Sequence, residues 1–406
     1  MSKESIQKEY LTFTSCFIHR IIITNLSLIK VTDNKLKIGV IGCGTVANIG
    51  HLPIYHKSPL AKIEAVSDPL ESHLRETQKR YKVPKAYQNP EDLLDDPDID
   101  AVSICSPHWA HSEQVIGAAR NEKHILCEKP IGLNLEDVNK MIKAVERNSV
   151  IFQTATQKRF DLGFQLIKEK VNEKEIGDIF HASVYWYHSM PDFGPNLRSD
   201  LIQEAGLWRI ISERCGGGDL LDHGPHYFDL FRWWFGEIKS VSAQIRRIRK
   251  GRVNEDHSTV LLSFKESETI AVFERSEAFF GNVYGEELGR IHGTNGTYYF
   301  NVPNEYFLKP MTLKKRSRKD NTSKIFEVET IFPKDRWNTA YAREIRSFIN
   351  QALERSNEDV GFPKEWIPTI YDGKAGLEIV LASYESQRTQ NTIQLPLKEY
   401  KPLVWY

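Results

Sequence analysis

Residues 37–47, KIGVIGCGTVA, decide the fold of this 406-residue chain. The apolar first half predicts a buried β-strand, and the residues that follow predict a helix to about position 57. Between them lies the pattern G-x-G-x-x-A, which in a strand–turn–helix context predicts a dinucleotide-binding turn. Gly42 permits the tight turn, Gly44 lets the backbone approach a pyrophosphate, and Ala47 lets helix and strand pack closely. The helix N-terminus then offers unpaired N–H groups to the phosphates.

A second predicted strand, residues 62–67, ends in Asp68. Asp68 follows Ala47 at close to the spacing of about 20 residues at which an acidic side chain binds the ribose hydroxyls of NAD. It also suits the N-cap of a predicted helix at 69–81, and the two roles are compatible. A carboxylate there repels a 2′-phosphate, so the sequence favours NAD over NADP. The alternative is NADP, with its phosphate held by the nearby side chains Ser67, Arg75 and Arg80.

Further strands and helices alternate along the first part of the chain. Strands are predicted at 100–105, 123–127 and 150–156, with helices at 109–121 and 135–147. This alternation predicts a mostly parallel, doubly wound sheet, and we assign residues 35–156 to a Rossmann dinucleotide-binding domain.

After Gly177 the pattern changes to closely spaced strands with alternating polarity, which predict a mainly antiparallel sheet. These strands are predicted at 179–187, 238–247, 258–264, 269–275, 288–292 and 297–301. Helices at about 336–355 and 369–389 and a strand at 392–395 close the chain. The fold class is therefore α/β, with a C-terminal α+β substrate-binding and oligomerisation domain over residues 157–406. The Lys/Arg-rich stretch 313–324 is interpreted as a solvated loop.

Residues 1–34 differ from the rest of the chain. The moderately apolar run 11–29 is interrupted by His19, Arg20 and Asn25, so it is too polar for a membrane span. It lacks a small-residue cleavage site. We interpret residues 1–34 as a non-core extension; the alternative is an amphipathic segment that docks on the body.

Composition limits the classes of partner. Basic and acidic residues balance at 54 each, so no global basic field attracts nucleic acid or an anionic membrane. The five cysteines are scattered and form no C-x-x-C pair, which argues against a disulfide framework and a structural zinc site. The expected partner is therefore a small molecule or another protein, and a reducing compartment, the cytoplasm, fits best.

The run Ile125-Leu-Cys-Glu128-Lys129-Pro130 predicts a strand that ends in charged residues. Ligands of open α/β sheets bind outside the carboxyl ends of the strands, so Lys129 is a candidate for chemistry. The alternative is a surface ion pair at a strand end. The preceding unit ends in Ser106-Pro107-His108, where His108 and His111 offer polar contacts to a cofactor or simply begin a solvated helix. Without a third ligand nearby, they give little support to a metal site.

The segment 215–235 is the second site-like stretch. Three glycines precede Asp219, which suits a helix N-cap. Asp222 and His226 are four residues apart and share a helix face that Asp229 continues. Pro225 is unusual inside such a helix and marks its start or a distortion. Asp222 and His226 could bind a metal ion, or form an acid/base pair in which the carboxylate orients the imidazole. The alternative is a buried contact in which the two side chains satisfy each other.

Taken in order, these motifs resemble those of the Gfo/Idh/MocA family, the relatives of glucose–fructose oxidoreductase and inositol 2-dehydrogenase. The likeness runs from about Lys35 to about Leu397, although the family often has Asn at the position of His108. The matching motifs are Gly42-x-Gly44-x-x-Ala47, Ser106-Pro-His108-x-x-His111, Glu128-Lys129-Pro130, Gln157-Lys-Arg159-Phe160, Trp208-Arg209, Gly216-Gly-Gly-x-x-x-Asp222-x-Gly-x-His226 and Gly293-Thr-Asn-Gly296.

The resemblance implies a Rossmann domain followed by a domain with an open, mainly antiparallel sheet, and homodimers or homotetramers built on the open sheet face. It implies that Lys129, Asp222 and His226 form the catalytic group. The expected cofactor contacts are Gly42, Gly44, Thr45, Val46, Ala47, Asp68, Ser106, His108, His111, Glu128, Lys129 and Gln157. The expected substrate contacts are Lys129, Arg159, Trp208, Arg209, Asp222 and His226.

The expected reaction is hydride transfer between NAD, or NADP, and a hydroxyl-bearing carbon of a sugar, sugar derivative or inositol. His226 is the expected base, oriented by Asp222, and Lys129 is expected to stabilise the alkoxide. Three alternatives stay open: a non-catalytic dinucleotide-binding regulator, an NAD-assisted glycosidase and a metal-dependent polyol dehydrogenase.

Overall fold

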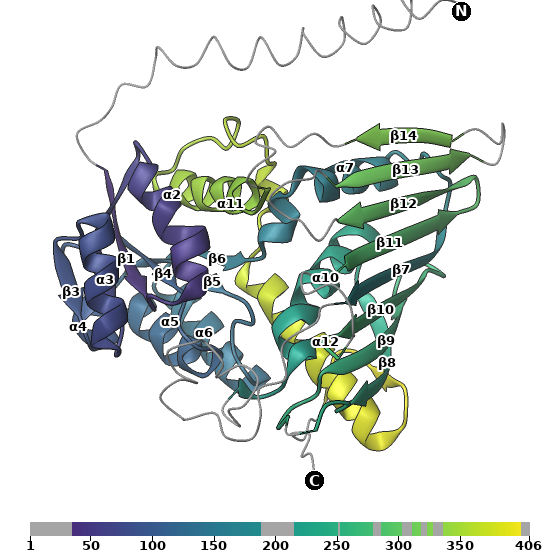
Figure 1. Ribbon diagram of the computed structural model, residues 1–406, viewed down its shortest axis with the longest axis horizontal. Coiled ribbons are helices and arrows are strands. Elements are labelled where there is room, and N and C mark those ends of the chain that lie inside the picture. The colour runs from purple at the N-terminus through teal and green to yellow at the C-terminus, as the bar shows by residue number, and fades with distance from the viewer. Residues whose placement is uncertain are drawn as a thin grey trace, which may run out of the picture. The chain divides into compact units, whose positions relative to one another are not determined.

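The computed structural model describes residues 35–187, 215–250, 252–278, 286–302, 311–317, 323–327 and 336–398. The first part of the chain forms a six-stranded parallel sheet of order β3-β2-β1-β4-β5-β6 (Figure 1). Its strands are β1 (Leu36–Ile41), β2 (Ala61–Ser67), β3 (Lys85–Tyr87), β4 (Ala101–Ile104), β5 (His124–Glu128) and β6 (Phe152–Ala155). The chain reverses its direction across the sheet between β1 and β4, so the carboxyl ends of these two strands border the crevice where such sheets bind ligands.

Helices separate the strands of this sheet, as the sequence predicted. They are η1 (Ala47–His51, a π-helical turn) running into α2 (Leu52–Lys57), α3 (Glu71–Tyr81), α4 (Pro90–Leu94), the 3-10 turn η2 (His108–Ala110) before α5 (His111–Arg120), and α6 (Leu135–Arg147). The sheet is buried on both faces, because alternate residues of β5 enter opposite cores: Ile125 and Cys127 one, Leu126 the other. Such two-sided burial explains why these strands are continuous apolar runs.

A nine-stranded sheet follows, of order β14-β13-β12-β11-β7-β10-β9-β8-β15. Every pairing is antiparallel except that of β7 with β10. The strands are β7 (Ile179–Tyr187), β8 (Ile238–Arg246), β9 (His257–Phe264), β10 (Ile270–Ser276), β11 (Glu286–Gly293), β12 (Gly296–Val302), β13 (Thr312–Ser317), β14 (Ser323–Glu327) and β15 (Ile393–Gln394). The expected fold class, a parallel Rossmann sheet followed by a mainly antiparallel sheet, is confirmed.

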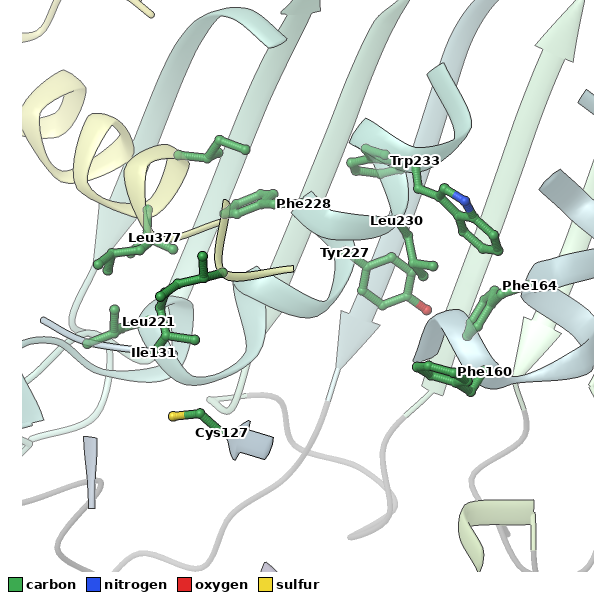
Figure 2. Close-up of a cluster of buried hydrophobic side chains, with 14 of the residues drawn as sticks. Cys127, Ile131, Phe160, Phe164, Leu221, Tyr227, Phe228, Leu230, Trp233 and Leu377 are labelled. Atoms are coloured by element: carbon green, nitrogen blue, oxygen red, sulfur yellow. The ribbon is translucent and has the colours of Figure 1, made fainter. Parts of the chain in front are cut away.

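One face of the second sheet is covered by helices (Figure 1). The remaining helical elements are η3 (Gln157–Phe160), α7 (Leu162–Asn172), α10 (Asp219–Phe235), α11 (Arg336–Ala352), η5 (Lys364–Trp366) and α12 (Ile370–Thr389). Figure 2 shows Tyr227 and Leu230 of α10 beside Phe160 and Phe164, all of them buried. Helix α11 returns to the first sheet, where Ile345 joins the same core as β1. The two sheets therefore share helices, and α10 begins close to the Rossmann strand ends.

The interpretation of residues 313–324 as a solvated loop was wrong, since most of this stretch lies in β13 and β14. The alternation explains the strand: Leu313 is buried, while Lys314 and Arg316 are exposed on the opposite side. Charged residues are common on strands near a sheet edge, where they discourage pairing with other chains.

Two sequence interpretations concern the membrane and the N-terminus. In the described part of the chain, no helix has both the length and the apolar character needed to cross a membrane. The proposed extension 1–34 lies outside the described residues.

Candidate active site

The glycine turn after β1 has the shape that its sequence predicted. Gly42 has φ +92°, and a Cβ there would lie 2.7 Å from the carbonyl oxygen of Cys105, so only glycine fits. A Cβ on Gly44 would meet no atom of the residues that the structure describes within 4 Å. Asn48, which the sequence reasoning missed, braces the turn by donating from Nδ2 to the carbonyl oxygens of Cys43 (2.7 Å) and Gly44 (3.0 Å). The open space over Gly44, together with the adjoining helix N-terminus, fits a dinucleotide pyrophosphate.

Asp68 lies buried beneath this turn. Its Oδ2 accepts the N–H of Cys43 at 2.7 Å and its Oδ1 accepts the N–H of Leu70 at 2.8 Å. The expectation that Asp68 is the helix N-cap was wrong, because α3 begins at Glu71 with Leu70 as its cap. The carboxylate instead joins the glycine turn to the chain leaving β2. A contact with the cofactor ribose stays a prediction.

A Gly44→Val variant separates cofactor binding from folding. We expect the unfolding temperature to stay close to that of the wild type, because the Cβ of the new side chain has no neighbour within 4 Å in the described part of the chain. NAD affinity should fall at least about 100-fold, since a side chain at this position blocks the approach of backbone to pyrophosphate. Calorimetric titration measures the affinity. Gly42→Ala is the contrasting control, expected to unfold more easily because it is strained at φ +92°. Wild-type NAD affinity in Gly44→Val would show that the dinucleotide binds elsewhere.

Glu128 at the end of β5 is buried, so the alternative of a surface ion pair was wrong. Its Oε1 lies 3.0 Å from Nε2 of His51, and its Oε2 accepts the N–H of Lys129 at 3.2 Å. Nδ1 of His51 lies 2.7 Å from Oγ of Ser103. Glu128 was expected to contact the cofactor, but its carboxylate instead fixes the backbone of Lys129. His51 was missed because its only sequence signal is a histidine on the buried side of a helix.

Lys129 joins the two parts of the chain. Its Nζ donates to Oδ1 and to the backbone oxygen of Asp222 on α10, both at 2.8 Å, and its peptide bond to Pro130 is cis. Nε2 of His108 lies 3.7 Å from the same Oδ1. The structure thus brings Lys129, Asp222 and His108 together at the carboxyl ends of β4 and β5.

His226 lies one helical turn beyond Asp222 and is buried. Among the described residues it forms no hydrogen bond with Asp222, and its Nδ1 has no partner, so the expectation that Asp222 orients the imidazole was wrong. The carboxylate is held by Lys129 instead. Burial, followed by the positive charge of Lys129, holds the pKa of His226 well below its usual value. The ring is therefore neutral and able to accept a proton.

Glu255 explains the last of the three glycines before α10, Gly218. Its carboxylate accepts the N–H groups of Gly218 (2.9 Å) and Leu220 (3.1 Å), and a Cβ on Gly218 would lie 2.2 Å from its backbone oxygen. Burial raises the pKa of Glu255 to about 7, although these N–H donors and the Tyr384 hydroxyl act to lower it. Asp219 is the first residue of α10 rather than its N-cap, which is Gly218. The helix continues through Pro225.

Two expected contacts are occupied by protein atoms. His111 is fully buried, with Nδ1 2.9 Å from the carbonyl oxygen of Pro130 and Nε2 2.9 Å from that of Ser106. It therefore clamps two turns rather than reaching the cofactor. Arg159 holds Asp229 through two contacts of 2.6 Å and Asp372 at 2.9 Å, so its guanidinium is a buried structural group rather than a substrate contact.

Four further residues were expected to contact the cofactor or the substrate: Ser106, Gln157, Trp208 and Arg209. Ser106 donates from Oγ to Oε1 of Gln114 at 2.5 Å. Gln157 is buried, and its Oε1 has no hydrogen-bond partner in the described part of the chain, which leaves an acceptor for a bound group. Trp208 and Arg209 lie outside the described residues.

A Rossmann sheet with an open glycine turn, and a lysine held by a carboxylate next to a neutral histidine, define a dinucleotide-dependent oxidoreductase. Comparison with protein families agrees. The model described as "Oxidoreductase family, NAD-binding Rossmann fold" matches residues 36–156, and the GFO/IDH/MocA C-terminal domain matches residues 164–299. The chain belongs to the Gfo/Idh/MocA family of oxidoreductases, which confirms the predicted family and the NAD-type cofactor.

Several relatives are similar over nearly the whole chain. Myo-inositol 2-dehydrogenase of Thermotoga maritima is 30% identical over 89% of this chain and 98% of its own length. The scyllo-inositol 2-dehydrogenase (NAD(+)) of Bacillus subtilis is 28% identical over 87% of this chain and 96% of its own. The crystal structure of a probable dehydrogenase from Thermotoga maritima superposes with a TM-score of 0.67 at 28% identity, covering 89% of this chain and 99% of that one. Levoglucosan dehydrogenase in complex with NADH, at 22% identity and a TM-score of 0.75 over 90% of this chain and all of that one, shares the fold.

Proposed function

We propose that this chain oxidises a ring hydroxyl of a cyclic polyol or sugar with NAD, and that Lys129, Asp222 and His226 form its catalytic group. The position of the Lys129 ammonium group carries the proposal. Its Nζ lies 2.8 Å from Asp222 and near the neutral His226. This ammonium group lies at the strand ends that border the Rossmann crevice. The names of the two inositol dehydrogenases among the relatives support the substrate class.

Residues 35–156 would hold the cofactor, and residues 157–406 would supply the substrate side. Gly44, Thr45 and Val46 would receive the pyrophosphate, and Gln157 offers a buried acceptor that has no partner among the described residues. Bound NAD supplies the hydride acceptor. The buried carboxylate of Asp68 favours NAD over NADP, since Arg75 and Arg80 are already paired with Glu71 and Glu76.

The protein's own groups divide the acid–base work. Lys129 donates a hydrogen bond to the substrate oxygen and stabilises the negative charge that develops on it. His226, neutral because of burial and of Lys129, accepts the hydroxyl proton. Asp222 holds the ammonium group of Lys129 in place through its carboxylate and its backbone oxygen.

The test is NADH formation, followed by absorbance, with inositols, aldoses and sugar acids, and with NAD and NADP in parallel. A clear rate with cyclic polyols or sugars, higher with NAD, is the expected result. If no substrate gives NADH although NAD binds, the proposal is contradicted, and a regulator or an NAD-assisted glycosidase is favoured.

The second sheet also suggests an assembly. Large apolar side chains are exposed on its strands: Phe180, Leu261, Ile270, Leu288 and Tyr299. We propose that this open face pairs two copies of the chain, as the hydrophobic effect favours covering such a patch. Sedimentation velocity of the full chain tests the pairing, and a monomer would contradict it. The free cysteines at 43, 105 and 127 support the cytoplasmic location that we propose.

A further inference from the structure

Helix α10 carries a second histidine next to the proposed catalytic group. Nδ1 of His223 lies 2.7 Å from Oδ1 of Asp219, and the same carboxylate oxygen is held by Nε of Arg275 at 2.9 Å. A neutral imidazole has one donor and one acceptor nitrogen. Nδ1 also lies 3.3 Å from the backbone oxygen of Asp219. Both neighbouring oxygens accept hydrogen bonds, so the proton resides on Nδ1 and Nε2 is the acceptor.

His223 lies in the same site as the proposed catalytic residues. Its ring packs edge-on against Trp186 at 5.0 Å, and the ring of His226 lies 6.1 Å from the same indole. The charges of Asp222 and Lys129 both act on His223. Burial, followed by Arg275, lowers its pKa to about 3, so the ring is neutral.

The acceptor nitrogen of His223 is available. The side chain is 24% exposed although Asp219 beneath it is buried, and Nε2 has no hydrogen-bond partner in the described part of the chain. An imidazole that is fixed on one side and open on the other is arranged to contact a ligand.

A metal ion is not the ligand that this cluster fits. Asp219, His223 and Glu277 place three ligand atoms within 4.8 Å of one another. Guanidinium groups already balance both carboxylates, because Arg275 lies 2.9 Å from Asp219 and 3.6 Å from Glu277, and Arg252 lies 3.1 Å from Glu277. A divalent cation would therefore be repelled, and the network serves to hold His223.

We propose that His223 contacts the substrate, with Nε2 accepting a hydrogen bond from a hydroxyl next to the one oxidised at His226. The site then selects substrates with a vicinal diol. Asp219 is a positioning residue that fixes the tautomer. The two histidines are three residues apart on one helix face, where side chains are neighbours. This inference rests on the proposed function and adds the recognition of a second hydroxyl.

The experiment compares the best substrate of the panel with its analogue that lacks the neighbouring hydroxyl. In His223→Ala we expect KM for the diol to rise about tenfold with little change in kcat, the loss of one hydrogen bond. The analogue should be used equally well by the wild type and the variant. His223→Gln, which keeps an acceptor oxygen, should recover most of the affinity. The exposed His56→Ala on α2 is the matched control.

Two results would overturn the inference. One is an equal rise in KM for both substrates in His223→Ala, and the other is an unchanged KM for both. Unchanged NAD affinity and unfolding temperature in the variants exclude a folding defect. If the wild type oxidises no alcohol at all, the proposed function fails, and that failure is distinguishable because it appears before any variant is compared.

Discussion

Replacing Lys129 with alanine is expected to lower kcat by about 10²–10³-fold while leaving NAD affinity nearly unchanged. The substitution removes the donor that stabilises charge on the substrate oxygen. It also leaves the carboxylate of Asp222 without its partner at 2.8 Å. The glycine turn that would receive the pyrophosphate keeps all of its own contacts. Steady-state kinetics and calorimetric titration with NAD measure the two quantities.

Lys140→Ala is the matched control for Lys129→Ala. Lys140 is 54% exposed on α6, and among the described residues it pairs only with carboxylates of its own helix, so its loss should leave kcat unchanged. Turnover at the wild-type rate in Lys129→Ala would remove Lys129 from the mechanism.

Arg159→Ala should lower the free energy of unfolding by about 3–5 kcal/mol. Arg159 is buried and holds both oxygens of Asp229, which is buried as well, and one oxygen of Asp372. Burial raises the pKa of Asp229, and Arg159 opposes that rise. Removing the guanidinium therefore leaves a buried carboxylate without its balancing charge, which destabilises the folded state. Chemical denaturation measures the loss.

Arg346→Ala provides the comparison for Arg159→Ala. Its pair with Asp359 is 2.6 Å long but lies on the surface, where an ion pair contributes under about 1 kcal/mol. An equal decrease in the free energy of unfolding in the two variants would contradict the structural role of Arg159.

The strands and the glycine turn were predictable because their signals are local. Two-sided burial of β5 and the positive φ of Gly42 follow from residues adjacent in sequence. The family resemblance likewise rests on ordered local motifs.

The errors came from contacts between distant residues. Arg159 was assigned to substrate because its partners Asp229 and Asp372, 70 and 213 residues later, cannot be recognised from its own neighbourhood. The carboxylate of Asp222 was assigned to His226, four residues away, whereas it bonds Lys129, 93 residues earlier. Helical spacing shows which residues share a face, but it does not show what packs against that face.

We propose that this site moves a hydride from a substrate carbon to NAD. The most direct measurement uses the active polyol or sugar carrying deuterium on the carbon to be oxidised, with mass spectrometry of the released nicotinamide cofactor. We expect deuterium in the released NADH and a ketone product, both formed far more slowly by Lys129→Ala. Deuterium retained on the substrate carbon, with no labelled NADH released, would contradict it. Release of free sugar under those conditions would indicate transient oxidation of the kind a glycosidase uses.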